Sequence, residues 1–500
     1  MQLQIERSEA PGARSAVPVY QQIAGQIHER VESGALVQGD RLPPIRDLAR
    51  KLGVNRDTVA LAYEALAAEG VVESRVGRGT FVRGLRPRGP GPSGPIELQF
   101  SSAAERLLDF ERSRPQFGVP SDTIPLHSLV PDSSMFPVEA FRRAVNRAFA
   151  DVGASLLAYG GPQGFAGLRE VLADRFRGFG LIVGPDSVVL SSGASQGISL
   201  AMRLFAESGD AVAIEAPTYH NALATVIALD LKPAPVPMRR TGPDLDALDR
   251  QLSRPEVKAF YTIPTFHNPM GISTSVAHRR DLLAIAKRYG KPVIEDAYEM
   301  DLRFAGRAIP SLAALDETGL VVQLTSFSKS LFPGVRAGAL VARGRAVDAL
   351  LVLKHPTDLG GTLPHQPALA AFVRSGAYDR HLVALRKRLR RRRDAMIETL
   401  SGEMPEGVSW TIPEGGYQIW LELPEPLDSL DLHAEAMRAG VLFAPGHQFH
   451  HDGRSSRGLR LTIALADETA IRRGVATLAR LVRERMAAGT ASARVASVHM

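Results

Sequence analysis

Cysteine is absent from this sequence of 500 residues. Disulfide bonds, thiolate metal sites and cysteine nucleophiles are therefore excluded, and the composition is compatible with a reducing cytoplasm. No apolar run reaches the length that crosses a membrane, and the start, Met1-Gln2-Leu3-Gln4, lacks the basic and apolar regions of a secretory signal. We therefore expect a soluble cytoplasmic protein with no membrane partner and no metal site.

Lysine is scarce, because arginine supplies most of the positive charge. Lys and Arg together number 60 against 53 Asp and Glu, and the net charge of +7 allows a polyanionic partner without requiring one. The lysines are Lys51, Lys232, Lys258, Lys287, Lys291, Lys329, Lys354 and Lys387. Of these, Lys329 has the neighbours best suited to binding a phosphate, so it is the leading candidate for chemistry.

The segment around Lys329 combines an amine with anion-binding side chains. It follows the apolar run 320–324, which predicts a buried strand, and it also carries Ser326, Ser328 and Arg336. Hydroxyl groups and a guanidinium fork bind a phosphate dianion, and a lysine amine forms a Schiff base with a carbonyl group. The segment therefore predicts a site for pyridoxal phosphate (PLP), with Lys329 as the attachment residue. A surface lysine in a polar loop is the simpler alternative.

An N-terminal segment has the element order of a winged helix-turn-helix. Gly53 provides the turn between two short helices, Asn55 caps the second of them, and Gly77 and Gly79 mark the turn of a hairpin. The expected elements are helices starting near residues 19, 45 and 56, and strands over 71–75 and 80–83.

The chemistry of this unit indicates recognition of duplex DNA. The helix that begins Asn55-Arg56-Asp57-Thr58 would enter the major groove, with its first turn against base edges and phosphates. Arg46 lies where the preceding helix would cross the backbone, and Arg75 and Arg78 would bring the wing to a neighbouring groove. The alternative is a module that serves only protein packing.

From residue 126 onward, predicted strands and helices alternate, which is the pattern of an open α/β sheet. Polar or aromatic residues follow several of these strands, at the edge where such sheets bind ligands. They are Ala194 and Ser195 after the strand near 187–190, Tyr219 after 211–215, Asn268 after 259–263, and Asp296 and Tyr298 after 292–295.

Together these residues supply what PLP needs. An ionised Asp296 keeps the pyridine nitrogen protonated, Asn268 and Tyr298 would donate to the phenolic oxygen, and Tyr219 offers an aromatic face to the ring. The phosphate group would be held by Ala194, Ser195, Ser326, Ser328 and Arg336. Taken singly, Asp296 also fits a strand-end cap, Asn268 a turn former and Tyr219 a core residue. The joint order of all these residues is what indicates a cofactor site.

Residues 17–82 resemble the GntR-family DNA-binding domain. The resemblance is carried by Tyr20-Gln21-Gln22-Ile23, Gly39-Asp40-Arg41-Leu42-Pro43, Arg46-Asp47-Leu48-Ala49, Leu52-Gly53-Val54-Asn55-Arg56-Asp57-Thr58-Val59, Ala62-Tyr63-Glu64 and Gly77-Arg78-Gly79-Thr80-Phe81-Val82. Pro44-Ile45 departs from the family, which has small polar residues there, and this puts a phosphate contact from the start of that helix in doubt.

Residues 126–481 resemble the fold-type I aminotransferases. Tyr159-Gly160-Gly161-Pro162-Gln163-Gly164 looks like the family element whose tyrosine reaches the cofactor phosphate of the other subunit, which implies a homodimer. Gly458-Leu459-Arg460-Leu461-Thr462 looks like the strand whose arginine grips the substrate carboxylate, so the resemblance gives that role to Arg460. An exposed strand arginine is the alternative.

The whole arrangement resembles the MocR/GabR-type transcriptional regulators. It implies a multidomain chain with an N-terminal winged helix-turn-helix (α+β), a large α/β aminotransferase-like domain and a smaller α+β C-terminal domain. The expected boundaries are 15–83 for the DNA-binding domain, 84–125 for the linker and connecting segment, 126–485 for the aminotransferase-like domain, 375–485 for its small subdomain, and 486–500 for a tail.

In that family the aminotransferase-like domain senses PLP or an amino-acid adduct of it and controls DNA binding. The implied partners are a double-stranded DNA operator, a small amino-acid-like effector and a second copy of the chain. The presence of both Lys329 and Arg460 favours a sensor of a carboxylate-bearing amine over a sensor of PLP alone. Because the residues for transamination are all present, a working PLP-dependent aminotransferase with an accessory DNA-binding module is the second hypothesis. A third is a dimerisation scaffold that has lost its chemistry.

Overall fold

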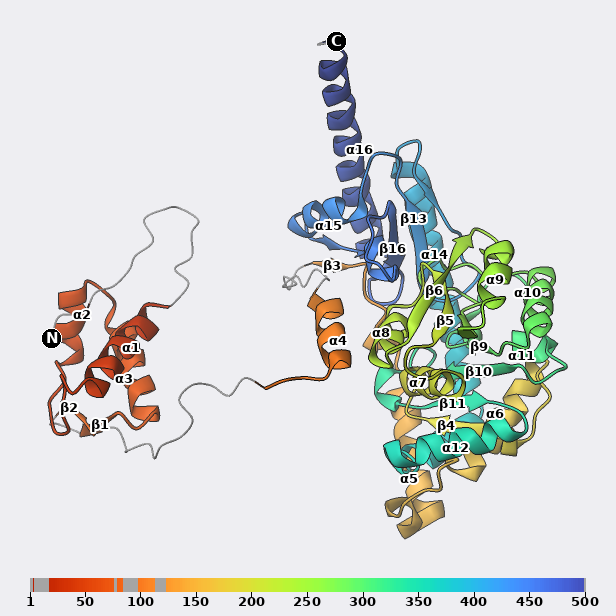
Figure 1. Ribbon diagram of the computed structural model, residues 1–500, viewed down its shortest axis with the longest axis horizontal. Helices are drawn as coiled ribbons and strands as arrows, with labels where there is room; N and C mark the ends of the chain where they lie inside the picture. Colours follow the sequence, from red (N-terminus) through yellow and green to blue (C-terminus); the bar gives the residue numbers. More distant parts are fainter. Residues whose placement is uncertain (1–2, 4–17, 76–78, 84–97, 113–122, 499–500) are drawn as a thin grey trace. The chain divides into compact units, whose positions relative to one another are not determined.

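The computed structural model describes residue 3 and residues 18–75, 79–83, 98–112 and 123–498 (Figure 1). The chain divides into two compact units, Met1–Gln99 and Phe100–Met500. Each unit buries an apolar core of its own. Each core is therefore built from residues of one unit alone.

The N-terminal unit is a winged helix-turn-helix. Its elements are α1 (Val19–Glu32), α2 (Ile45–Leu52), α3 (Arg56–Ala68), β1 (Val72–Arg75) and β2 (Gly79–Val82). Gly53 adopts a left-handed conformation (φ 64°) between α2 and α3, and the Asn55 side chain accepts a hydrogen bond from the Asp57 amide at 3.2 Å. Ile23 and Leu66 are fully buried in its core. The helix-turn-helix fold expected from the sequence is confirmed.

The larger unit is built on an eight-stranded sheet of order β4-β11-β10-β9-β8-β5-β6-β7. The strands are β4 (Val188–Ser191), β5 (Ala211–Ala216), β6 (Lys232–Arg239), β7 (Gly242–Pro243), β8 (Val257–Thr262), β9 (Val293–Asp296), β10 (Val321–Ser326) and β11 (Gly338–Val341). Within this sheet, β11 and β7 run against their neighbours. β4, β5, β8, β9 and β10 therefore run in one direction and end at one edge of the sheet.

Helices cover both faces of this sheet, because successive residues of a strand point to opposite sides. Within β5, Ala213 packs into the core on one face and Ile214 into the core on the other. The first face is covered by α6 (Ala166–Gly178), α9 (Leu245–Leu252), α10 (Val276–Tyr289) and α11 (Leu312–Leu315). The second is covered by α7 (Ala194–Phe205), α8 (His220–Ala228) and α12 (Arg345–Asp358). The α/β architecture expected from the alternating pattern is confirmed.

A second, four-stranded sheet follows toward the C-terminus, in the order β12-β13-β16-β15. It consists of β12 (Ser409–Trp410), β13 (Gln418–Glu422), β15 (Ala444–Pro445) and β16 (Gly458–Thr462), and it lies with α14 (Ala377–Glu403), α15 (Ser429–Arg438) and α16 (Glu468–Val498) (Figure 1). A parallel pair, β3 (Ile124–Pro125) and β14 (Val441–Leu442), ties residues near 125 to this part.

Shorter elements complete the larger unit. They are α4 (Ser102–Arg112), α5 (Val138–Val152), α13 (His365–Arg374), η1 (Ser133–Met135), η2 (Gly153–Leu157), η3 (Pro185–Ser187), η4 (Met300–Leu302), η5 (Pro333–Val335) and η6 (Gly446–Phe449). α4 packs beside α8, and the Arg106 guanidinium lies 2.5 Å from the Asp230 carboxylate. None of the helices in the described ranges combines the length and apolar character needed to cross a membrane.

The run of basic residues 386–393 predicts a solvated face of a long helix. The stretch does lie in α14, but only part of it faces solvent. Arg392 is 2% exposed, donates to the carbonyl oxygens of Ile463 and Ala464, and pairs with Asp132 at 2.7 Å. Arg393 donates to the Pro413 carbonyl oxygen at 2.9 Å. Arg392 and Arg393 face inward because buried oxygen atoms accept their hydrogen bonds. The number of charges in the sequence does not show which arginines have such partners.

Arg279, which is fully buried in α10, fastens the turn that follows β8. Its guanidinium donates to the carbonyl oxygens of Pro264 (2.7 Å) and Pro310 (2.8 Å) and to the side chains of Thr265 and Thr274. The same turn is tied to β5 by the hydrogen bond between His267 and Glu215 at 3.1 Å, so Arg279 and Glu215 are two buried side chains that hold it.

We predict that Arg279→Met lowers the free energy of unfolding by about 3 kcal/mol or more, because it leaves several buried acceptors without a donor. The measurement is equilibrium unfolding in urea. Arg280→Met is the matched control, because Arg280 is exposed on the same helix and its loss should change stability by less than about 0.5 kcal/mol. Equal effects of the two substitutions would contradict the assignment.

Candidate functional site

The common edge of the large sheet opens into a cavity of about 550 Å³. Residues that follow five strands meet there: β4 is followed by Ala194 and Ser195, β5 by Tyr219, β8 by Asn268, β9 ends at Asp296, and β10 leads to Lys329. Tyr298, Ser326, Ser328, Arg336 and Arg460 also line the cavity. The structure thus brings together all of the predicted cofactor and carboxylate-binding residues except Tyr159.

One end of the cavity is suited to an anion. Gly193 has a positive φ of 97° and precedes the first turn of α7, where amide groups have no partner within the helix. A Cβ atom at Gly193 would lie 3.2 Å from the Arg336 guanidinium, so glycine permits this close approach. Arg336 donates to the Ser192 carbonyl oxygen at 2.6 Å, and the Ser326 hydroxyl accepts from the Ser328 amide at 3.2 Å.

Asp296 supplies a buried carboxyl group at the end of β9. Tyr261 donates to its Oδ2 at 2.8 Å, whereas Oδ1 is buried without a hydrogen-bond partner among the described residues. Burial raises the pKa of Asp296 to about 7, against the lowering effect of the Tyr261 hydrogen bond. The carboxyl group is therefore placed to receive a donor that the protein itself does not supply.

Arg460 reaches this edge from β16 of the second sheet. It donates to Asn268 Oδ1 at 2.8 Å and to the His127 carbonyl oxygen at 2.9 Å, and its guanidinium lies 4.9 Å from the centre of the Phe449 ring. Burial lowers the pKa of Arg460 to about 10, which leaves it a cation at neutral pH. In the part of the chain that the structure describes, Asn268 Nδ2 is buried and has no acceptor.

Lys329 is held by hydrogen bonds to its side chain and to its backbone. Its Nζ donates to the Leu129 carbonyl oxygen at 2.7 Å, and the Tyr417 hydroxyl donates to the Lys329 carbonyl oxygen at 2.7 Å. Burial lowers the pKa of Lys329, and the nearby Glu299 carboxylate acts against this shift. A lysine with a lowered pKa has a larger fraction of neutral, nucleophilic amine.

Two tyrosines flank the middle of the cavity. The rings of Tyr219 and Tyr298 are nearly parallel, with 7° between their planes and 6.4 Å between their centres. The Tyr298 hydroxyl accepts from Gln418 Nε2 at 2.5 Å, so its own proton is available for donation.

Several contributors were missed by the sequence reasoning. Some of them lie outside the pattern of polar residues at strand ends, and others lie in strands, where a side chain ordinarily packs in the core. The residues that contact or line the site in this way are Glu299, Tyr261, Gln418, Leu129 and Phe449. Glu299 follows Tyr298 directly, and burial raises its pKa to about 8. Its position directly after the strand-end pattern Asp-x-Tyr is the sequence signal that could have predicted its place at the site.

Tyr159 lies outside the cavity. Its side chain is 85% exposed in the loop between η2 and α6. The expectation for this residue concerned the site of another subunit, so its position in one chain leaves that role untested.

The predicted DNA-contact residues lie mainly on the exposed side of the N-terminal unit. Arg46 and Arg56 are exposed in the first turns of α2 and α3, and Thr58 is half-buried. Arg75, at the end of β1, is 2.5 Å from the Glu73 carboxylate and 5.5 Å from the centre of the Phe81 ring. Arg78 lies outside the described residues.

We predict that stability of the cofactor-free protein declines between pH about 4 and 7 partly through Asp296. Its pKa is raised in the folded state, so over this window the folded chain holds a proton that the unfolded chain has released, and raising the pH favours unfolding. Asp296→Asn should flatten this decline in thermal unfolding, and Asp281→Asn, at an exposed position, should not. An unchanged slope in Asp296→Asn would contradict the prediction.

Comparison with known proteins identifies both units. Residues 128–478 match aminotransferase class I and II, and residues 19–82 match bacterial regulatory proteins of the gntR family. The HTH-type transcriptional regulator YdcR of Escherichia coli is 31% identical over 93% of this chain and 99% of its own length. The probable rhizopine catabolism regulatory protein MocR of Rhizobium meliloti is 28% identical, over 92% of this chain and 93% of its own.

Solved structures resemble the larger unit. The multiple substrate aminotransferase of Thermococcus profundus is 32% identical with a TM-score of 0.70, covering 78% of this chain and 96% of that one. LysN, the alpha-aminoadipate aminotransferase of Thermus thermophilus, is 31% identical with a TM-score of 0.71, covering 78% and 98%. The chain therefore belongs to the MocR-type transcriptional regulators, in which a gntR-family DNA-binding domain precedes an aminotransferase class I and II domain.

Proposed function

We propose that this regulator binds operator DNA through its N-terminal unit and senses PLP, together with a carboxylate-bearing amine, through its larger unit. The observation that carries the proposal is one cavity that combines a half-buried lysine amine, two unpaired polar atoms and a buried arginine. Buried polar groups in folded proteins normally have hydrogen-bond partners, so a domain that served only as a scaffold would not be expected to leave these atoms without them.

The residues of the cavity fit PLP. Asp296 Oδ1 lacks a donor, which a protonated pyridine nitrogen would provide, and Asn268 Nδ2 lacks an acceptor, which a phenolic oxygen would provide. The amides at the start of α7, with Ser326, Ser328 and Arg336, would hold the phosphate group. When bound, PLP would supply a carbonyl group that reacts with amines and a ring that withdraws electrons.

Arg460 supports a carboxylate on the effector. Its guanidinium lies at the cavity wall as a buried cation, and its present partners are an amide oxygen and a carbonyl oxygen, both neutral. An incoming carboxylate would replace neutral acceptors with a charged one, which forms a stronger hydrogen bond. To act as a signal, the amine must bind one arrangement of the protein better than another.

A homodimer is proposed from the exposed apolar surface near Tyr159. Val138 and Phe149 of α5 and Leu157 of η2 are 65%, 45% and 77% exposed, and Tyr159 follows them in the chain. Exposed apolar groups of this size favour burial against a partner. A second copy of the chain would bring its own Tyr159, as the resemblance to aminotransferases implies.

Transamination is a second candidate function, favoured by the complete set of Lys329, Asp296 and Arg460 in one cavity. The aromatic-amino-acid aminotransferase 1 of Thermococcus litoralis is 33% identical over 73% of this chain. Sustained conversion of an amino donor and a keto acid would favour the enzyme. A change in the spectrum of bound PLP on adding an amine, without turnover, would favour the sensor.

We expect purified protein to bind its own upstream DNA with an affinity that changes on adding PLP, and Lys329→Ala to lose this change. The reason is that covalent attachment requires the lysine amine, whereas the fold does not. Fluorescence anisotropy at fixed salt measures the DNA affinity. The control is Lys287→Met, which removes an exposed lysine of α10. Lys354 is not used for this purpose because it is buried. A Lys329→Ala protein that responds to PLP as the parent does would contradict the role of covalent attachment, and a parent protein whose DNA affinity changes with neither PLP nor amines would support the scaffold hypothesis.

Arg56→Ala should weaken operator binding by about 1 to 3 kcal/mol if the first turn of α3 reads a base. Arg307→Ala, which removes the same charge from an exposed position of the larger unit, should leave the affinity unchanged. Competition with unrelated DNA separates loss of base reading from loss of phosphate contacts. Equal operator affinity of the Arg56 variant and the parent would remove this turn from recognition.

A further inference from the structure

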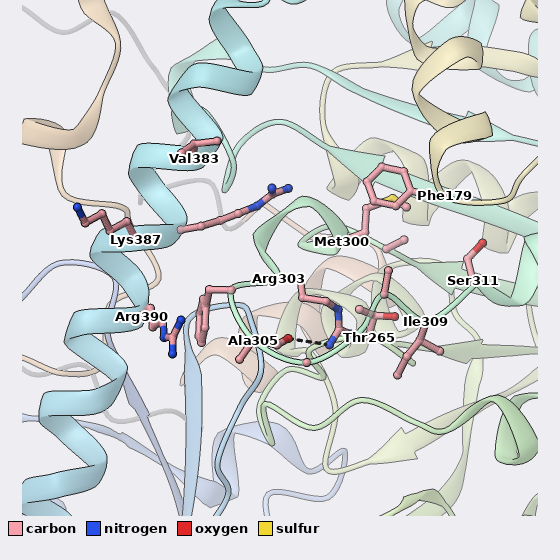
Figure 2. A pocket seen from close by; sticks show the side chains of 15 residues that line it. Phe179, Thr265, Met300, Arg303, Ala305, Ile309, Ser311, Val383, Lys387 and Arg390 are labelled. Atoms are coloured by element: carbon pink, nitrogen blue, oxygen red, sulfur yellow. Dashed lines mark hydrogen bonds between the residues drawn. The ribbon is translucent and has the colours of Figure 1, made fainter.

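A second cavity, of about 600 Å³, lies in the larger unit and contains none of the residues assigned to the cofactor site. Figure 2 shows it between one side of α14 and the loop that follows β9. α14 contributes Val383, Arg386, Lys387 and Arg390, and the loop contributes Arg303, Phe304, Ala305 and Ile309. The spacing of the α14 residues places them on one helix face. The size suits a small organic molecule.

The charge around this cavity is one-sided. Four of its lining residues are basic and none is acidic: Arg303, Arg386, Lys387 and Arg390. Arg386 uses its Nε to donate to the Asp301 carbonyl oxygen at 2.7 Å, which fixes the stem of the guanidinium and leaves its outer nitrogens for another acceptor. Arg390 is 3.9 Å from Asp394, a loose contact at an exposed position. Such a cluster attracts an anion.

Arg303 gives a second, independent indication. Its side chain is 13% exposed, Nη1 pairs with Glu414 at 2.5 Å, and the guanidinium lies 4.8 Å from the centre of the Phe266 ring. Its Nη2 is buried without an acceptor among the described residues. A buried guanidinium nitrogen without an acceptor is costly, and a bound anion would satisfy it.

The remaining lining is apolar. Phe179, Met300, Phe304, Ile309 and Val383 contribute aromatic and aliphatic surface to the same cavity. A purely inorganic anion would leave this surface unused, whereas an anion with an aromatic or branched body would bury it.

The two cavities share one short segment of chain. Asp296 and Tyr298 line the cofactor cavity, whereas Ala297 and Met300 line the second one. Residues of a single segment therefore line both cavities. A molecule that displaces Ala297 or Met300 would also displace the carboxyl and hydroxyl groups of Asp296 and Tyr298.

We propose that the second cavity binds a small organic anion, a carboxylate or a phosphate ester on an aromatic or branched apolar body, and that its occupancy changes the cofactor site through residues 296–300. The binding site stands on its own observations. The coupling rests on the proposed binding of PLP.

The test begins with calorimetric titration of the full chain, saturated with PLP so that the cofactor positions of the first cavity are occupied. Binding of a carboxylate at Arg460 is separated from binding in the second cavity by the variants described below. The probes are phenylacetate, phenyl phosphate, neutral phenylacetamide and inorganic phosphate. We expect one of the aromatic anions to bind about tenfold tighter than the neutral amide and the inorganic phosphate, because both charge and apolar surface contribute. The tighter of the two aromatic anions identifies the carboxylate or the phosphate ester as the preferred group. Equal binding of phenylacetamide would overturn the site.

Variants locate the binding. Arg386→Gln and Arg390→Gln should each lower the affinity for the aromatic anion by about fivefold or more. Ala308→Trp, on the loop that lines the cavity, should block binding of the anion. Arg391→Gln removes the same charge from the neighbouring position of α14, outside the lining, and should have no effect. Unchanged affinity in Arg386→Gln and Arg390→Gln, or equal weakening in Arg391→Gln, would overturn the proposal.

The coupling is tested by the visible absorbance of bound PLP. Saturating aromatic anion should shift this absorbance in the parent protein and in Arg391→Gln, and Arg390→Gln should require a higher concentration for the same shift. If the anion binds without any shift, the site stands and the coupling is overturned. If PLP itself fails to bind, the proposed function fails, while the calorimetric comparison of variants in the cofactor-free protein still decides the second site.

Discussion

The parallel direction of β4, β5, β8, β9 and β10 forces the chain to leave all five strands at one edge of the large sheet. Most polar groups of the cavity at this edge depend on this constraint, because residues far apart in sequence meet where those strands end, whereas Arg460 is added from β16 of the second sheet. The buried Arg279 holds the turn after β8 by donating to residues at both of its ends, Pro264 and Thr274. The site therefore depends more on where the fold places these side chains than on which residue types they are.

Burial gives the cavity its chemistry. It raises the pKa values of Asp296 and Glu299 and lowers those of Lys329 and Arg460, in each case because a buried charge loses hydration. These groups are costly to the fold unless a ligand or an opposite charge offsets the loss. The unpaired atoms of Asp296 and Asn268 are the atoms that the proposed PLP site would use.

The chain joins two kinds of recognition that follow different physics. The N-terminal unit presents exposed arginines at the starts of α2 and α3, which suits a polyanion whose binding depends on salt. The larger unit offers cavities, where single hydrogen bonds and ion pairs discriminate between small molecules. Regulation then requires that a small molecule bound in the larger unit change how readily the N-terminal unit binds DNA.

The sequence alone predicted the main elements and most of the polar residues that line the cavity at the edge of the large sheet. Apolar runs followed by polar residues locate strand ends, Gly53 and Asn55 locate the helix-turn-helix, and the scarcity of lysine isolates Lys329, because these signals are local in the chain. Tertiary structure decided the rest. It brought Arg460 of β16 onto Asn268, buried Arg392 within a stretch expected to face solvent, and placed Glu299 and Tyr261 at the site. Those contacts join residues separated by long stretches of chain, and their energies depend on burial, which no local pattern specifies.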